Sequence, residues 1–235
     1  MRTRLRTPVA GPLIATALLL LAACSADPLN IVVLSARAPG DECKFDDDTL
    51  YVSRGSLDLT PFDVGGATFV QNRYYQVFGW QNNLQQNPVT VGGQVVDPGT
   101  GNDFIADSIV YEYQYSDPSV TLTTESANMH AVITAGGQST DNSVPADLIQ
   151  PQAFAAINGS TAIDTSAQTL LVTFQIFGRL TAGGSKYTNK VSFPLTIRRL
   201  STTPVNCGAL TPPQVVNGGP CGFPGRDMAV SCIAP

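Results

Sequence analysis

Ionisable side chains are scarce in this sequence, and histidine and tryptophan are almost absent. Only 13% of the 235 residues are charged, and the chain has one histidine and one tryptophan. Glu and Lys, which normally coat helices, are few, whereas Thr, Ser, Asn, Gln and Gly are abundant. This composition is typical of an all-β protein, and the length suffices for one sizeable β-sandwich or two small ones.

The common catalytic motifs are also missing. His130 is the only histidine, and the sequence contains no G-x-S-x-G elbow, no P-loop and no dinucleotide fingerprint. We therefore predict a protein that is not an enzyme, with no catalytic residues and no cofactor. A glycosidase-like enzyme is kept as an alternative, because two of the 18 acidic residues could meet in the fold.

Metal-binding patterns are equally weak. No C-x-x-C pair accompanies the single histidine, which argues against the usual zinc sites. The acidic run Asp46-Asp47-Asp48 is interpreted as a solvated loop, because neighbouring side chains on an extended chain point to opposite sides. Segment 97–103 carries glycines where a calcium loop needs oxygen ligands. The sequence therefore predicts no metal site.

The N-terminus has the order of a secretory signal. Arg2, Arg4 and Arg6 precede a mostly apolar run from Leu13 to Leu21, and Ala22-Ala23-Cys24 follows. Nine residues span about 14 Å as a helix, roughly half of a bilayer core, so the run is too short for a transmembrane helix. Leu-Ala-Ala-Cys resembles the bacterial lipobox, which is cut before a cysteine that becomes acylated. We predict a signal peptide over 1–23, lipidation of Cys24 and a tether over 24–30.

The charge balance of the chain beyond the predicted cut limits its partners. The removed segment carries three arginines and no acid, so ten basic and 18 acidic residues are left, a net charge of about −8. This balance argues against nucleic acid, which needs a basic stripe, and against membrane binding through a polybasic patch. Membrane attachment is expected through the lipid alone, since two or more acyl chains give stable anchoring.

Four cysteines follow the predicted lipidation site. They are Cys43, Cys207, Cys221 and Cys232. An even number in an exported protein indicates two disulfides, for which three pairings exist. Cys221 and Cys232 are close in sequence across a Gly/Pro-rich turn, so we predict that pair, together with Cys43–Cys207.

The clearest strand pattern is a late hairpin. Two alternating runs of apolar residues flank a glycine-rich turn, and their side chains are expected to face the core. These residues are Leu170, Val172, Phe174 and Ile176, then Val191, Phe193, Leu195 and Ile197. Pro194 has no N–H group and should face a sheet edge or a bulge.

Shorter patterns predict the other strands. Segment 109–115 alternates strictly, and 74–81 is partly apolar on both faces, which indicates a central strand. Further strands are expected at 31–34, 50–52, 57–59, 67–71, 121–124 and 130–134, with a hairpin over 89–96. Segment 153–157 fits either a helical turn or a short strand. We predict an antiparallel immunoglobulin-like β-sandwich over 31–200 and a disulfide-pinned, Cys-rich C-terminal cap over 201–235.

Aromatic residues suggest an alternative function. Trp80, Tyr111, Tyr113 and Tyr115 could form an exposed platform for a carbohydrate, or they could be buried in the core. A platform needs at least two coplanar rings that are open to solvent. The alternative prediction is a carbohydrate-binding surface module that uses these four side chains.

The overall layout resembles the secreted lipoproteins that are numerous in myxobacteria. The resemblance rests on the lipobox at Cys24, the early Cys43, the hairpin Phe177-Gly178-Arg179 … Ser192-Phe193-Pro194-Leu195 and the tail with Pro224-Gly225-Arg226-Asp227. It implies a lipid-anchored envelope protein with a β-rich ectodomain and supplies no catalytic residues. In such Gram-negative lipoproteins Ser after the acylated cysteine implies the outer membrane, and Ser25 fits. We expect a non-catalytic outer-membrane lipoprotein that faces the periplasm or the cell surface. It is expected to serve as a structural or protein-interaction module, in contact with an envelope protein or a surface glycan.

Overall fold

The computed structural model describes residues 30–38, 51–86, 89–97, 102–136, 143–210, 214–218 and 220–234. Half of the chain is in strands and a tenth in helices, which confirms the predicted β-rich class. The predicted signal peptide, Cys24, Cys43 and the acidic run 46–48 lie outside the described residues. Within the described ranges, no helix is both long and apolar enough to cross a bilayer.

The elements follow one another as strands interrupted by short helical segments. The strands are β1 (Ile31–Arg37), β2 (Tyr51–Val52), β3 (Gly55–Asp58), β4 (Phe62–Val64), β5 (Ala67–Phe69), β6 (Tyr75–Asn82), β7 (Val89–Val91), β8 (Gln94–Asp97), β9 (Phe104–Tyr115), β10 (Glu125–Ile133), β11 (Ser143–Asp147), β12 (Gln168–Leu180), β13 (Ser185–Tyr187), β14 (Val191–Arg198), β15 (Val215–Val216) and β16 (Cys232–Ile233). The helical segments are α2 (Pro151–Asn158) and the 3-10 turns η4 (Ala162–Asp164), η5 (Cys207–Ala209) and η6 (Pro220–Gly222).

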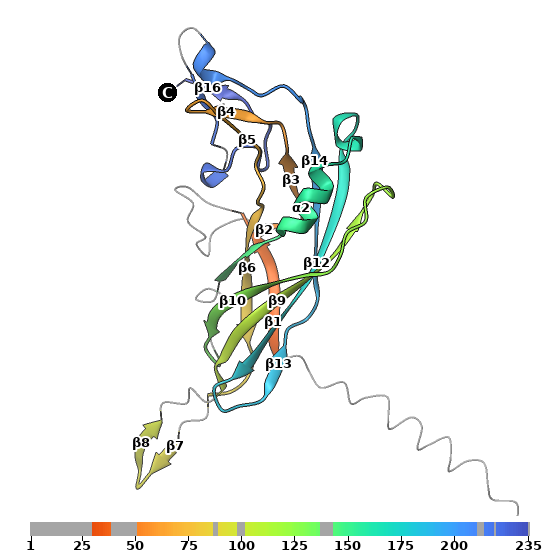
Figure 1. The fold of residues 1–235 in the computed structure, drawn as a ribbon. Coiled ribbons are helices and arrows are strands. Elements are labelled where there is room, and N and C mark those ends of the chain that lie inside the picture. Colours follow the sequence, from red (N-terminus) through yellow and green to blue (C-terminus); the bar gives the residue numbers. More distant parts are fainter. Residues whose placement is uncertain are drawn as a thin grey trace, which may run out of the picture.

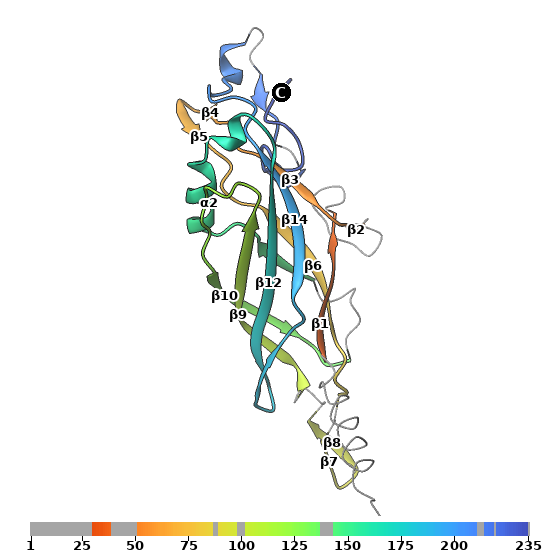
Figure 2. The ribbon, with the colours of Figure 1, turned by 90° about the vertical axis from the view of Figure 1, so that its right-hand side faces the viewer.

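Two larger sheets form the body of the molecule (Figures 1 and 2). One has the strand order β11-β6-β1-β2, and the other has β10-β9-β12-β14-β3, with β13 also paired to β12. All of these pairs are antiparallel except β14–β3, which is parallel. The small ribbons β4-β5 and β15-β16 lie at one end of the molecule, and the ribbon β7-β8 lies at the other (Figure 1).

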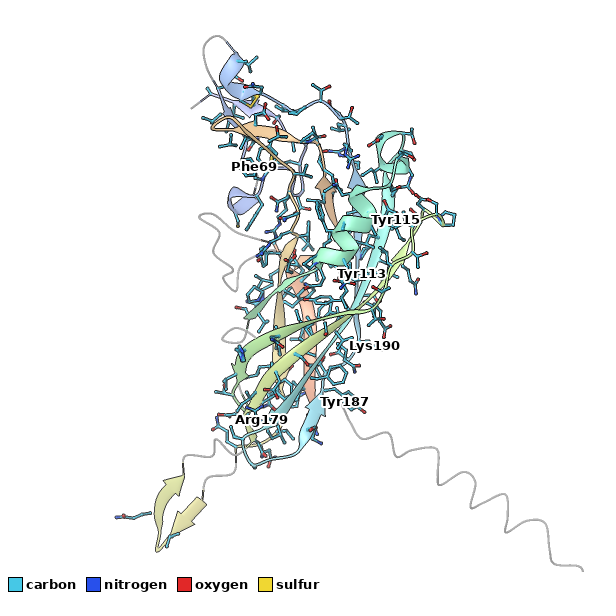
Figure 3. The ribbon with its side chains drawn as sticks, in the orientation of Figure 1. Phe69, Tyr113, Tyr115, Arg179, Tyr187 and Lys190 are labelled. Atoms are coloured by element: carbon cyan, nitrogen blue, oxygen red, sulfur yellow. A yellow bond between two sulfur atoms is a disulfide. The ribbon has the colours of Figure 1, made fainter. Side chains whose placement is uncertain are left out.

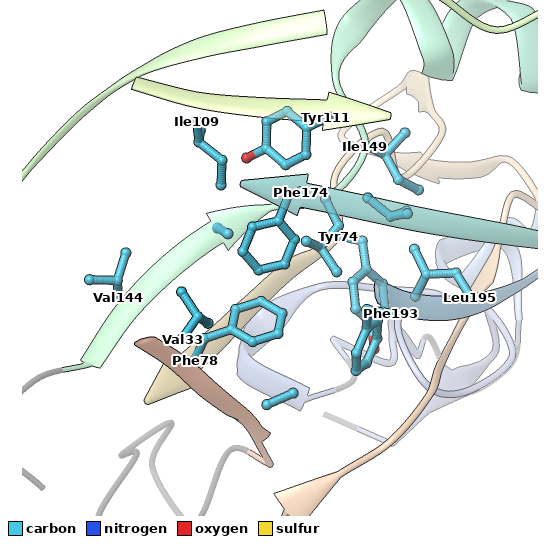
Figure 4. Packing of buried hydrophobic residues seen from close by; sticks show 14 of the residues in the cluster. Val33, Tyr74, Phe78, Ile109, Tyr111, Val144, Ile149, Phe174, Phe193 and Leu195 are labelled. Atoms are coloured by element: carbon cyan, nitrogen blue, oxygen red, sulfur yellow. The ribbon is translucent and has the colours of Figure 1, made fainter. Parts of the chain in front are cut away.

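The predicted late hairpin supplies the centre of the core. Strand β12 pairs with β14 over seven residues, and the apolar faces of both strands are buried, apart from the half-buried Val191. Phe78 of β6 packs edge-on against Phe174 at 4.8 Å between ring centroids and against Phe193 at 6.0 Å. These contacts join the two sheets face to face (Figure 4). The prediction that this hairpin faces the core is confirmed.

Two finer strand predictions are also confirmed. Strand β6 is central, with β11 on one side and β1 on the other. The backbone N–H and C=O groups of successive residues in a strand point to alternate sides. The Arg198 carbonyl accepts a hydrogen bond from the Leu59 N–H on the β3 side of β14, so the nitrogen of Pro194, an even number of residues earlier, also faces that side. The pairing with β3 begins only at Leu195, so no ladder bond is lost at the proline.

Two other segments differ from the expectation. Residues 121–124 are not a strand, and the strand predicted at 130–134 begins earlier, at Glu125. Segment 153–157 lies in helix α2, which has Pro151 in its first turn. The Glu125 carboxylate accepts hydrogen bonds from the free N–H groups of Gln152 and Ala153, and so it holds the start of α2 against β10.

The C-terminal tail is fastened to the edge strand β3. The Asp58 N–H donates to the Gly225 carbonyl and the Asp227 N–H donates to Ser56, both at 2.8 Å. The Tyr74 hydroxyl donates to the Asp227 carboxylate at 2.9 Å. Residues 225–227 therefore cover the outer edge of β3.

The tail contains a disulfide between Cys207 and Cys232. The predicted pairs Cys221–Cys232 and Cys43–Cys207 are therefore wrong. The reason is that β15 pairs with β16 and the Gln214 N–H donates to Cys207, which brings Cys207 beside Cys232. Cys221 is also disulfide-bonded.

Candidate functional site

The four aromatic residues predicted as a carbohydrate platform do not form one. Trp80 is 0% exposed and Tyr111 is 1% exposed, so both belong to the core. Tyr113 and Tyr115 are half-buried beside α2, where the Tyr113 hydroxyl accepts a hydrogen bond from Gln150 (Figure 3). Tyr111 and Tyr113 are nearly coplanar, at 7° between ring planes, but Tyr111 is closed to solvent. Alternation correctly placed the row on one face, and that face is covered by the opposite sheet and α2.

One cavity opens on the flank of the molecule, between edge strands of the two sheets. It has a volume of about 430 Å³, within the usual range for a small-ligand site. Strand β10 borders it on one side and β11 on the other, with residues of β9 also in its walls and α2 at one end. Its lining comprises Asn72, Arg73, Tyr75, Ile109, Tyr111, Ala127, Asn128, Met129, Pro145, Ala146, Asp147, Ile149, Gln150, Pro151 and Phe154.

Asp147 contributes the one carboxylate among these lining residues. Its Oδ1 atom accepts hydrogen bonds from the backbone of Tyr74 at 3.2 Å and Ile149 at 3.5 Å. Its Oδ2 atom lies 3.9 Å from the Arg73 Nε atom, and the Asp147 side chain is only 20% exposed. Burial raises the pKa of this carboxyl, and the two backbone bonds and Arg73 oppose the rise. The neighbouring hydrogen-bond donors and Arg73 therefore stabilise the negative charge of Asp147 by less than burial destabilises it.

Tyr111 contributes a hydroxyl group to the cavity. It makes no hydrogen bond with any described residue, although the side chain is 1% exposed (Figure 4). Burial raises the pKa of Tyr111, and repulsion from Tyr113, Asp147 and Tyr75 adds to this effect. The hydroxyl stays protonated, so it can both donate a hydrogen bond to a ligand and accept one.

Arg73 and Tyr75 form the outer rim. The Arg73 guanidinium donates a short hydrogen bond to the Tyr75 hydroxyl and lies 5.7 Å from the centre of the Tyr75 ring. The Arg73 side chain is 57% exposed. The cation thus lies toward solvent at the mouth, and Asp147 lies further inside.

The alternative of glycoside hydrolysis needs two carboxylates on either side of the substrate, and the described lining of this cavity contains one, that of Asp147. In the part of the chain that the structure describes, no three His, Cys, Asp or Glu residues are grouped as metal ligands. Apolar walls combined with a few convergent polar groups are the usual make-up of a ligand pocket.

The edge of β10 beside the cavity presents unpaired backbone groups. The N–H group of Ser116, just after β9, donates to Thr169 and so points toward β12. Because backbone groups alternate along β9, the N–H and C=O of Ile109 point the other way, toward its partner Ala127 in β10. The N–H groups of Ser126 and Asn128 therefore point away from β9, and no described residue accepts from them. This edge can accept another strand.

The neighbouring edges are protected. On β11 the Leu148 N–H donates to β6, so Pro145 takes an outward position, where it has no N–H group to offer. Residues 225–227 cover the outer edge of β3. Strand β10 carries a register shift between Asn128 and Ala131, and Val132 beyond it is 61% exposed.

Sequence reasoning missed Arg73, Tyr75 and Asp147. Arg73 and Tyr75 lie just before and at the start of β6, and Asp147 ends β11, so only the pairing of these strands brings them together. The one local signal was a lone acid in the apolar stretch that precedes Pro151. No protein-family model matches the chain, and no curated protein or solved structure is significantly similar to it.

Proposed function

We propose that this chain is a non-catalytic lipoprotein of the bacterial outer membrane that binds an envelope protein by adding a strand of the partner to β10. The open N–H groups of Ser126 and Asn128 are the observation that carries this proposal, because the edges of β11 and β3 are blunted by a proline or covered by the tail. Backbone pairing gives affinity in this mode, and pockets beside the edge give specificity.

The attachment to the membrane is proposed from the N-terminal sequence. The lipobox ends at Cys24, and the first described strand begins only seven residues later at Ile31. A lipid on Cys24 would hold the β-domain close to the bilayer, on the periplasmic or the cell-surface side. The acidic net charge supports a lipid anchor rather than electrostatic adhesion to anionic lipid.

We also propose that the fold is an immunoglobulin-like sandwich. Strands β1, β6 and β11 fit strands A, B and E of one sheet, and β14, β12, β9 and β10 fit G, F, C and C′ of the other. Strand β3 fits a continuation of strand A that crosses over to run parallel with the last strand. Folds of this class are common in cell-surface binding proteins, which supports a binding function.

The test is capture of a partner from the outer-membrane fraction by the full chain, with two matched serine-to-proline variants. Ser126→Pro removes an outward N–H group from β10. Ser185→Pro does the same on β13, because the Thr188 N–H donates to Ile176 and alternation turns Ser185 outward. We expect Ser126→Pro to abolish capture and Ser185→Pro to preserve it. Equal capture by both variants would contradict the proposal.

A further inference from the structure

The flank cavity lies where a side chain of an added strand would enter. Ala127, Asn128 and Met129 of β10 line it, so a strand paired with this edge would pass along the cavity mouth. Successive side chains of a strand point to opposite faces, and alternate residues of the partner would therefore face the cavity. This inference rests on the proposed function, and it concerns the chemistry of the residue that enters.

The polar atoms in the cavity favour a cation. Among the described residues, the Oδ2 atom of Asp147 has one charged contact, with the Arg73 Nε atom at 3.9 Å, beyond hydrogen-bonding distance. The Tyr111 hydroxyl oxygen has no hydrogen-bond partner in the same described part of the chain. Gln150 and Asn128 add amide oxygens to the same lining. A purely apolar side chain in the cavity would exclude water from the Asp147 carboxylate and the Tyr111 hydroxyl without offering them a hydrogen bond. Burying polar groups in this way costs free energy.

The apolar walls add a second requirement. Ile109, Ile149 and Met129 are all buried and line the same cavity, and Phe154 of α2 lies at one end. A ligand that fills this space needs an aliphatic body as well as a charged end. The ammonium of lysine is compact and carries three donors on a four-carbon stem, whereas the planar guanidinium of arginine needs a fork of acceptors.

We propose that the cavity binds the side chain of a lysine of the partner, with its ammonium between the Asp147 carboxylate and the Tyr111 hydroxyl and its stem against the apolar wall. Arg73 at the rim is the one cationic side chain in the lining. It opposes a second cation, and because it is 57% exposed, solvent screens most of this repulsion. The acidic net charge of the chain agrees with a cationic ligand.

Titration of the full chain with a small probe tests the cavity without the partner. The probe is Nα-acetyl-lysine methylamide, and its uncharged counterpart is the norleucine compound, which has the same four-carbon stem without the ammonium group. Binding is followed by calorimetry and by changes in amide resonances of residues 127–129. We expect the lysine probe to bind at least about tenfold more tightly than the norleucine compound, since a charged hydrogen bond distinguishes them.

Variants then assign the interaction to the named groups. Asp147→Asn keeps an acceptor for the Tyr74 and Ile149 N–H groups, and it should weaken the lysine probe about tenfold. Tyr111→Phe removes a hydroxyl that has no hydrogen-bond partner among the described residues, and it should weaken binding about threefold without loss of folding. Arg73→Gln should strengthen binding about threefold, because a competing cation is lost. Arg179→Gln is the control. It removes an exposed ion pair with Asp107 outside the cavity lining, so the affinity for the lysine probe should not change.

Two results would overturn the inference. One is equal binding of the lysine and norleucine probes, and the other is unchanged binding of the lysine probe by Asp147→Asn. If the probes fail while Ser126→Pro still abolishes partner capture, the lysine assignment is wrong and strand addition stands. If the lysine probe binds as expected while capture is insensitive to Ser126→Pro, the cavity site stands and strand addition is wrong.

Discussion

Gly225 is the residue on which the attachment of the C-terminal tail depends most sharply. Its φ angle is +82°, which side chains other than glycine rarely adopt. A Cβ atom at this position would lie 2.4 Å from the Asp58 carbonyl oxygen and 3.2 Å from Val230. Gly225→Ala therefore has to move the tail away from β3, or strain both segments.

The expected loss of stability has two parts. The left-handed backbone costs an alanine about 1–2 kcal/mol. Displacement of the tail also weakens the two backbone hydrogen bonds between residues 225–227 and β3, each of which contributes about 0.5–1.5 kcal/mol. We expect Gly225→Ala to lower the free energy of unfolding by about 2–5 kcal/mol.

Gly184→Ala is the matched control. Gly184 has a φ angle of +88°, and a Cβ atom there would meet nothing within 4 Å. It should cost only the backbone part, about 1–2 kcal/mol. Urea unfolding of the full chain measures both variants, and limited proteolysis should cleave the tail faster in Gly225→Ala alone. Equal losses in the two variants would refute the close packing of the tail on β3.

Two further predictions concern the core and the cavity. Phe174→Ala should lower the free energy of unfolding by about 3–5 kcal/mol, measured by thermal melts, because it leaves a void against Phe78. Phe174→Asp should abolish the cooperative melt, because it buries a charge in the core. A cooperative melt of the aspartate variant would show that this hairpin is not the core. Burial raises the pKa of Asp147 above its usual 3.8, so the folded state favours the protonated carboxyl. The contribution of this group to the free energy of unfolding is therefore full at low pH, and it is lost as the pH rises through the raised pKa. Asp147→Asn should therefore gain stability relative to the parent chain as the pH rises from below 3.8 through the raised pKa, and a stability difference that stays constant with pH would contradict the burial of this carboxyl.

The sequence predicted the strands whose apolar and polar residues alternate regularly. The alternation in 170–177 and 191–197 identified the core hairpin, because a half-buried strand must place every second side chain in the core. The same alternation placed Tyr111 and Tyr113 on one face. It could not say whether that face is open, since the cover comes from the opposite sheet and from α2.

Non-local pairings account for what was missed. The parallel contact of β3 with β14 joins segments far apart in the chain and has no local signature. The disulfide prediction failed because closeness in sequence favoured Cys221, whereas the β15–β16 ribbon brings Cys207 to Cys232. Arg73 and Asp147 belong to no motif, and they meet only because β6 pairs with β11.

Amide hydrogen exchange at Ser126, Ala127 and Asn128 tests strand addition most directly. In the free full chain, Ala127 should exchange slowly because its N–H group faces β9, and its two neighbours should exchange fast. In the captured complex, all three should exchange slowly. Fast exchange at Ser126 and Asn128 in the complex would contradict partner binding at β10.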